Sequence, residues 1–100
     1  MKTSELTGAA LDWAVAKCEG HKINKRTLCH YNPSTNWSQG GPIIDREKIG
    51  TGFGVGIDFD RWEAGYTTPE ETGPTPLIAA MRCYVANKLG DNVELPEGLN

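Results

Sequence analysis

Two glycine-proline segments contain the residues of this sequence that are best placed to bind a ligand. Gly40-Gly41-Pro42 and Gly73-Pro74-Thr75-Pro76 each precede an apolar run. The start of a helix leaves backbone N–H groups unpaired, and an anion such as phosphate is stabilised there. We therefore expect phosphate-binding N–H groups near Gly41 and Thr75.

Aromatic and basic side chains near these segments complete a candidate site for a small anionic, nucleotide-like ligand. Tyr31 and Trp37 could stack on a base, and Arg82 could pair with a phosphate. The predicted ligand-binding residues are Tyr31, Ser34, Thr35, Trp37, Gly40, Gly41, Gly73, Thr75 and Arg82. The alternative is plain helix capping and core packing, because helix starts commonly have this composition.

A second group of residues could perform acid–base chemistry. Asp58 and Asp60 are two positions apart and Glu63 follows them. Paired carboxylates can act as general acid and base or hold a hard cation. Neighbouring Arg61 and the expected turn at Asp60 favour a solvated hairpin end instead, and we predict no catalytic residue.

Thiols and imidazoles gather within a short stretch of the chain. The residues are Cys18, His21, Cys29 and His30. Zinc uses these ligand types, but the paired-cysteine spacing of zinc sites is missing. We expect free cysteines, no metal and no cofactor, and Cys83 is interpreted as an inert core thiol.

Two helices frame the chain and would position these groups. The first runs from about Thr7 to Glu19 and places Asp12 on its water-facing side. The second has Thr75 as N-cap, Pro76 at its first position and Gly90 as its stop. Between them a short middle helix is predicted, either capped by Ser34 or Thr35 or opened by Pro42.

A small antiparallel sheet is expected between the helices. From Ile49 to Phe59 the odd positions are apolar or β-branched, and four even positions are glycine. This strict alternation predicts a strand, with residues 61–67 returning as its partner. Residues 27–31 are a further short strand candidate, and 68–74 a loop. The fold class is therefore α+β, with the sheet packed against the helices.

Length and charge limit the function classes. One hundred residues suit a single α+β domain, with residues 91–100 as an acidic C-terminal tail. The net charge of -3 disfavours general nucleic-acid binding, which requires a basic surplus. No apolar run approaches membrane-spanning length and no secretory signal is present, so no membrane partner is expected.

Three blocks of the sequence together resemble the NinX family of small proteins from lambdoid phages and prophages. They are residues 3–16, 33–44 and 73–85. Residues 47–72 resemble the family least and look shorter than usual. The resemblance implies a phage accessory protein in the host bacterial cytoplasm, and it implies no catalytic residues.

The leading functional hypothesis is a non-catalytic binder that sequesters a small nucleotide-derived host immune signal. Small phage proteins of similar size act as such sponges, usually as symmetric oligomers, which makes a homo-oligomer an expectation by analogy of context. One alternative is an inhibitor or adaptor that contacts a host protein through Trp13 and Trp62. A further alternative is a hydrolase of such a signal that uses Asp58, Asp60 or Glu63.

Overall fold

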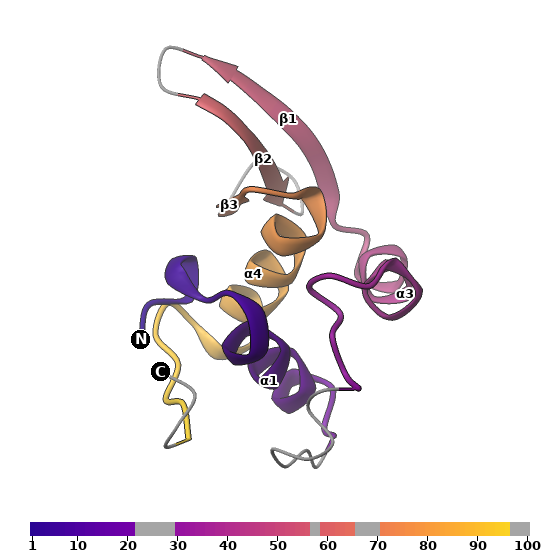
Figure 1. Ribbon diagram of the computed structural model, residues 1–100, viewed down its shortest axis with the longest axis vertical. Coiled ribbons are helices and arrows are strands. Elements are labelled where there is room, and N and C mark those ends of the chain that lie inside the picture. The colour runs from indigo at the N-terminus through magenta and orange to yellow at the C-terminus, as the bar shows by residue number, and fades with distance from the viewer. Residues whose placement is uncertain (22–29, 57–58, 66–70, 97–100) are drawn as a thin grey trace.

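The α+β fold is confirmed in the computed structural model, which describes residues 1–21, 30–56, 59–65 and 71–96 (Figure 1). A 3-10 helix, η1, comes first (Thr3–Glu5) and α1 follows it (Gly8–Cys18). Helix α3 (Trp37–Glu47) leads into strands β1 (Gly50–Gly56), β2 (Phe59–Gly65) and β3 (Glu71–Gly73). Helix α4 (Pro76–Leu89) completes the order. None of the helices in these residues is long and apolar enough to cross a membrane.

Helix α4 is the centre of the fold. Its predicted start is confirmed, because the Thr75 side chain accepts a hydrogen bond from the Ile78 N–H and Pro76 occupies the first position. Every residue from Ala79 to Val85 is buried, so this helix is covered on all sides rather than amphipathic. It packs against η1, α1, α3 and all three strands.

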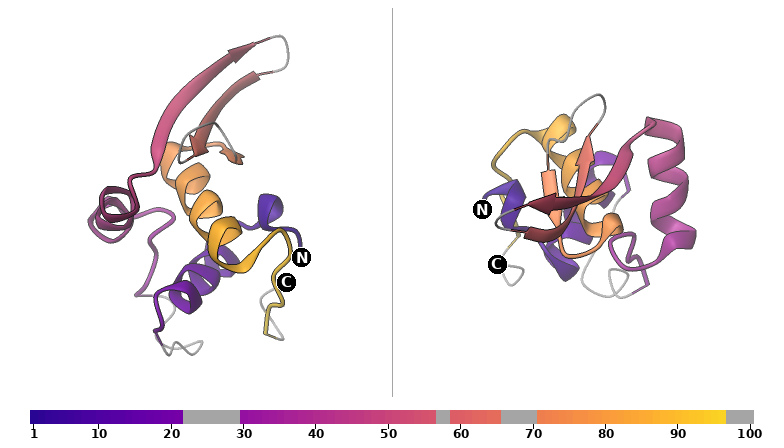
Figure 2. Two further views of the ribbon diagram at one scale, coloured as in Figure 1. Left: turned by 180° about the vertical axis from the view of Figure 1, so that it is seen from behind. Right: turned by 90° about the horizontal axis from the view of Figure 1, so that it is seen from above.

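The three strands form an antiparallel sheet in the order β1-β2-β3. Gly50 pairs with Gly65 and Gly56 with Phe59, so Asp60 lies within β2 rather than at the expected turn. β3 pairs with β2 where a loop was expected. The β1–β2 hairpin extends away from the helices, and Figure 2 shows the same from behind. The expected strand at 27–31 falls mostly outside the described residues, and residues 30 and 31 are not in a strand.

Helices α1, α3 and α4 are joined by one charged cluster. The Arg46 guanidinium donates two hydrogen bonds to the Glu19 carboxylate, at 3.0 and 2.6 Å. The Tyr84 hydroxyl donates to the same carboxylate. The bonds from Arg46 and Tyr84 outweigh partial burial and lower the pKa of Glu19, so this carboxylate stays ionised. The cluster therefore fixes the C-terminal end of α1 against the other two helices.

The two ends of the described chain lie side by side (Figure 1). The Met1 and Val93 backbones exchange hydrogen bonds of 3.0 and 2.9 Å, and Lys2 bridges to Asn92. Val93 is buried in the core. The first residues of the expected acidic tail are therefore part of the fold, and residues 97–100 lie outside the described chain.

Candidate functional site

The two glycine-proline segments meet in space at Gly40 and Leu77. A Cβ atom at position 40 would lie 2.5 Å from Leu77 Cδ1 and 2.4 Å from the Pro33 carbonyl oxygen. Contacts this short leave room only for glycine. The predicted halves of the site are thus neighbours, but the space between them at Gly40 is filled by protein atoms.

The expected helix start at Gly40-Gly41-Pro42 is wrong. These residues lie inside α3, which begins at Trp37 with Asn36 as its N-cap, and neither Ser34, Thr35 nor Pro42 opens the helix. The Asn36 side chain accepts hydrogen bonds from the N–H and the hydroxyl of Ser38. The Gly40 N–H donates to the Asn36 carbonyl at 2.9 Å. The donors expected near Gly41 are therefore used by the helix itself.

At the start of α4 two of the backbone donors are also engaged. Ile78 N–H donates to the Thr75 hydroxyl at 3.1 Å, and Ala79 N–H donates to the Thr75 carbonyl at 3.0 Å. Gly73 ends β3, and a Cβ atom there would lie 2.9 Å from the Ala79 nitrogen. Gly73 and Thr75 therefore allow close packing and cap the helix, which is the alternative that the sequence left open.

The Arg82 side chain is buried and hydrogen-bonds to the backbone. Only 8% of the residue is exposed. Its Nε donates to the Leu6 carbonyl at 2.9 Å, and its Nη1 donates to the Thr72 carbonyl at 2.8 Å. Burial lowers the pKa of Arg82, opposed by the charge of Glu71. The guanidinium links the segment before α1 to β3.

The loop before α3 is anchored by a buried carboxylate that the sequence interpretation missed. Asp12 was expected to face water, but it is buried, with only 5% of the residue exposed. Its Oδ1 accepts a hydrogen bond from the Ser34 N–H at 2.9 Å. Burial raises the pKa of Asp12, and hydrogen bonding to Ser34 opposes the rise. Ser34 is itself fully buried, whereas Thr35 is exposed.

Gln39 is a second anchor of this loop. Its side-chain oxygen accepts the Asn32 N–H at 2.6 Å, and its nitrogen donates to the His30 carbonyl at 2.9 Å. Tyr31 between them is partly buried and its ring meets His21 edge-on, with ring centroids 5.4 Å apart. Burial raises the pKa of Tyr31 to about 12. No spacing rule would have identified Gln39, because it bonds backward to a loop.

Trp37 is the exposed aromatic member of the predicted set. It is 55% exposed at the first position of α3, and its ring carbon Cε3 would lie 3.8 Å from a Cβ atom at Gly41. Met1 is the other large hydrophobic residue exposed in the described ranges. Trp13 and Trp62 are partly buried and pack against the core. The exposed aromatic surface of this region therefore belongs to Trp37.

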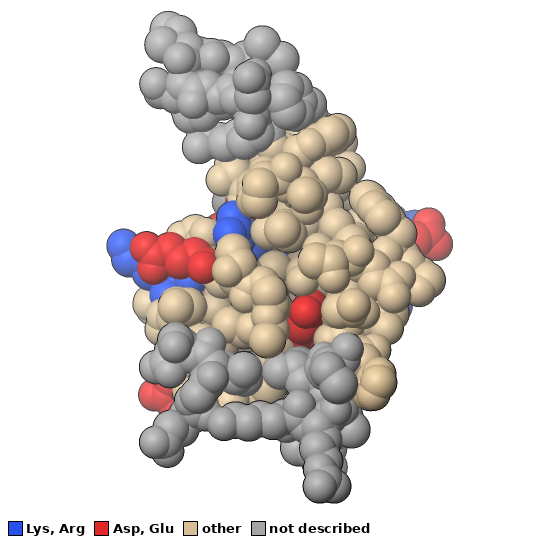
Figure 3. Space-filling view, viewed as in Figure 1, with Lys and Arg blue, Asp and Glu red and all other residues tan. Residues whose placement is uncertain are grey.

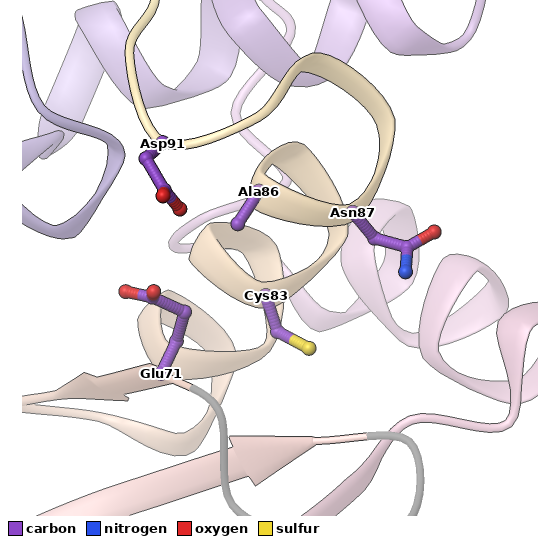
Figure 4. Close-up of a pocket in the computed structure, with 5 residues that line it drawn as sticks. All are labelled: Glu71, Cys83, Ala86, Asn87 and Asp91. Carbon is purple, nitrogen blue, oxygen red and sulfur yellow. The ribbon is translucent and has the colours of Figure 1, made fainter.

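A cavity of about 300 Å³ lies elsewhere, beside the middle and end of α4. It is lined by Glu71, Cys83, Ala86, Asn87 and Asp91 (Figure 4). The Glu71 and Asp91 carboxylates reach into the same space. Two acidic side chains repel a phosphate, so this cavity does not suit an anion.

Within the described residues, the remaining candidates form no group that could hold a metal. Asp58 and Cys29 lie outside the described residues, and β2 places the Asp60 backbone opposite Val55. The described chain contains no group of three or more His, Cys, Asp or Glu side chains that could hold a metal. Burial raises the pKa of Cys18 to about 11, so this thiol is protonated at neutral pH.

The surface charge is mixed where it can be seen. On the face shown in Figure 3, acidic and basic atoms lie together at the left edge, and the tan surface between carries no broad basic patch. Nucleic-acid binders concentrate positive charge on one face. The described part of this face shows no such concentration of positive charge.

Comparison with known proteins identifies one matching protein family. A family model described as "Bacteriophage P22, NinX" matches residues 2–88. The comparison with curated proteins found no match.

Proposed function

The chain belongs to the NinX family of bacteriophage P22, and on that premise we propose that it is a phage accessory protein that acts by binding. The contact is the surface around Trp37, and the partner is a host protein in the bacterial cytoplasm. The exposure of Trp37 is the observation that carries this proposal.

The physical support is the unusual placement of the Trp37 indole. Burying a large aromatic side chain is strongly favourable, and tryptophan is enriched among the residues that dominate binding energy. The Asn36 cap fixes the start of α3, so the ring is presented from an ordered helix. Its sequence neighbours Thr35, Asn36 and Ser38 are polar, and protein interfaces commonly have a polar rim.

A nucleotide-derived host immune signal is the second candidate ligand, and the same ring supports it. An exposed indole can stack on a base, which is worth about 1–3 kcal/mol. The N–H groups of Gly40 and Ile78, and two nitrogens of Arg82, are already hydrogen-bonded. A sponge of this kind would therefore have to hold its phosphates with other donors, which is why a protein partner is favoured.

Two binding measurements test the proposal and separate its two forms. In a pull-down from host lysate, the wild-type chain should retain a host protein that Trp37→Ala loses and Trp13→Phe retains. Calorimetry with that purified protein should then reproduce the Trp37 dependence. A thermal-shift screen of cyclic dinucleotides and ADP-ribose derivatives tests the sponge, since a ligand at 100 times its Kd stabilises the fold by about 2.7 kcal/mol. If neither experiment gives a Trp37-dependent ligand, the proposal fails.

A further inference from the structure

Strand β1 has an unpaired edge. It hydrogen-bonds to β2 on one side, and in the described sheet no strand lies on its other side. Figures 1 and 2 show the hairpin extending beyond the helices, with α3 near only the base of β1. An edge of this kind presents a row of backbone donors and acceptors that can pair with another strand.

Nothing in β1 protects this edge. Natural sheets block exposed edges with lysine or other charges, with proline, or with a bulge. The strand Gly-Thr-Gly-Phe-Gly-Val-Gly contains no charge and no proline, and its seven residues pair with β2 without interruption. Packing within the described chain does not require glycine at position 52, because a Cβ atom there would meet nothing within 4 Å.

The sequence of β1 is self-complementary about Phe53. Positions equally distant from Phe53 match in type: Gly52 with Gly54, Thr51 with Val55, and Gly50 with Gly56. In antiparallel pairing of two copies about a twofold axis at Phe53, each residue therefore faces its own kind. A shift by one residue would place every glycine opposite a larger residue, and a shift by two would remove two of the seven pairs.

We propose that a second copy of this chain pairs with β1 along this edge, antiparallel and centred on Phe53. The two three-stranded sheets then form one continuous sheet in the order β3-β2-β1-β1-β2-β3. By sequence, this register sets Thr51 opposite Val55 in each half and Phe53 opposite its own copy, and pairs of β-branched or aromatic residue types are favourable in sheets. This surface is separate from Trp37 and does not depend on the proposed function.

Charge reversal at a single position tests this register. Thr51→Lys/Val55→Lys places like charges opposite each other in both halves of the dimer, whereas Thr51→Glu/Val55→Lys places opposite charges there. The two variants share the change at Val55, which lies opposite Asp60 within the chain. Circular dichroism and thermal unfolding establish that both variants fold.

Sedimentation equilibrium over a range of concentrations gives the dissociation constants. The wild type should have twice the 10.9 kDa mass of one chain at high concentration. The Lys/Lys variant should dissociate at least about tenfold more readily than the Glu/Lys variant. A wild type that stays monomeric, or two folded variants with equal dissociation constants, would overturn the proposal.

Discussion

At the scale of single residues, the polar groups that hold this fold together bond to the backbone. Arg82 reaches the carbonyls of Leu6 and Thr72, and Asp12 takes the N–H of Ser34. Both side chains are ionisable and both are buried. A buried charge that loses its partner destabilises the fold, so the main role of these two side chains is structural.

Asp12 provides a direct measurement of that cost. Asp12→Ala should lower the free energy of unfolding by about 1–3 kcal/mol, because the Ser34 N–H is left buried without an acceptor. Asp12→Asn retains an acceptor oxygen and removes the buried charge, so at pH 7 it should be as stable as wild type or more stable. Urea unfolding of the three proteins measures this, and an Asn variant as unstable as the Ala variant would contradict it.

The same residue predicts a pH dependence. The pKa of Asp12 is raised from 3.8 in the folded protein, so the folded state binds its proton more tightly than the unfolded chain. Stability from this group is therefore greatest below pH 3.8 and falls as the pH rises through the folded pKa. The stability advantage of Asp12→Asn over wild type should grow across that window and then level off. An advantage that is constant with pH would show that Asp12 ionisation is not responsible.

The residue scale is also where the sequence was least informative about the candidate site. The types of the predicted residues suited a ligand, but some of their hydrogen-bond partners lie far away in sequence, as Leu6 does from Arg82 and Asp12 does from Ser34. Local spacing cannot show that a donor is already used by a distant carbonyl. The sequence also could not show that Trp37 is the exposed tryptophan, because residue type does not distinguish it from Trp13 and Trp62, which pack against the core.

At the scale of elements, local signals predicted α1 and α4 well. Thr75, Pro76 and Gly90 mark the ends of α4 within the chain itself. Helix α3 was harder, because Pro42 lies inside it and would normally end a helix. β3 has three residues and exists only through pairing with β2, so no pattern within it could predict a strand.

Alanine substitution at two adjacent glycines of α3 tests the close packing at Gly40. Gly41→Ala should change the free energy of unfolding by no more than about 1 kcal/mol, because the helix preference of alanine is opposed by contact of its Cβ with the ring of Pro42. Gly40→Ala should lower it by about 1–3 kcal/mol, because the Cβ collides with Pro33 and Leu77. Chemical denaturation of both variants provides the comparison. Equal effects would show that α3 and α4 are not packed at Gly40.

At the scale of the whole molecule, the fold consists of a helical body and a hairpin that extends from it. The helical body is organised around α4, which contacts η1, α1, α3 and the sheet. The hairpin is less well buried, since Gly50 and Thr51 are exposed at its base. Binding through Trp37 would use the body, and pairing of two copies would use the hairpin, so the two surfaces can act independently.

Closure of the chain ends should contribute measurably to the stability of the whole. Val93→Ala should lower the free energy of unfolding by about 2 kcal/mol, because Val93 is 4% exposed and packs in the core. Glu94→Ala is the matched control at an exposed neighbour and should change stability by no more than about 0.5 kcal/mol. Thermal unfolding of the pair measures this, and a Val93→Ala variant as stable as the control would mean that residues beyond α4 are dispensable.

The joining of Met1 to Val93 has a consequence for folding of the protein during its synthesis. Helix α1 is synthesised before α4, which packs against it, and before Val93, which hydrogen-bonds to Met1. Bacterial ribosomes add about 5–20 residues per second, so the apolar face of α1 waits for several seconds without its partners. During that interval the nascent chain exposes apolar surface that chaperones bind, and its yield in bacterial cells should depend on them.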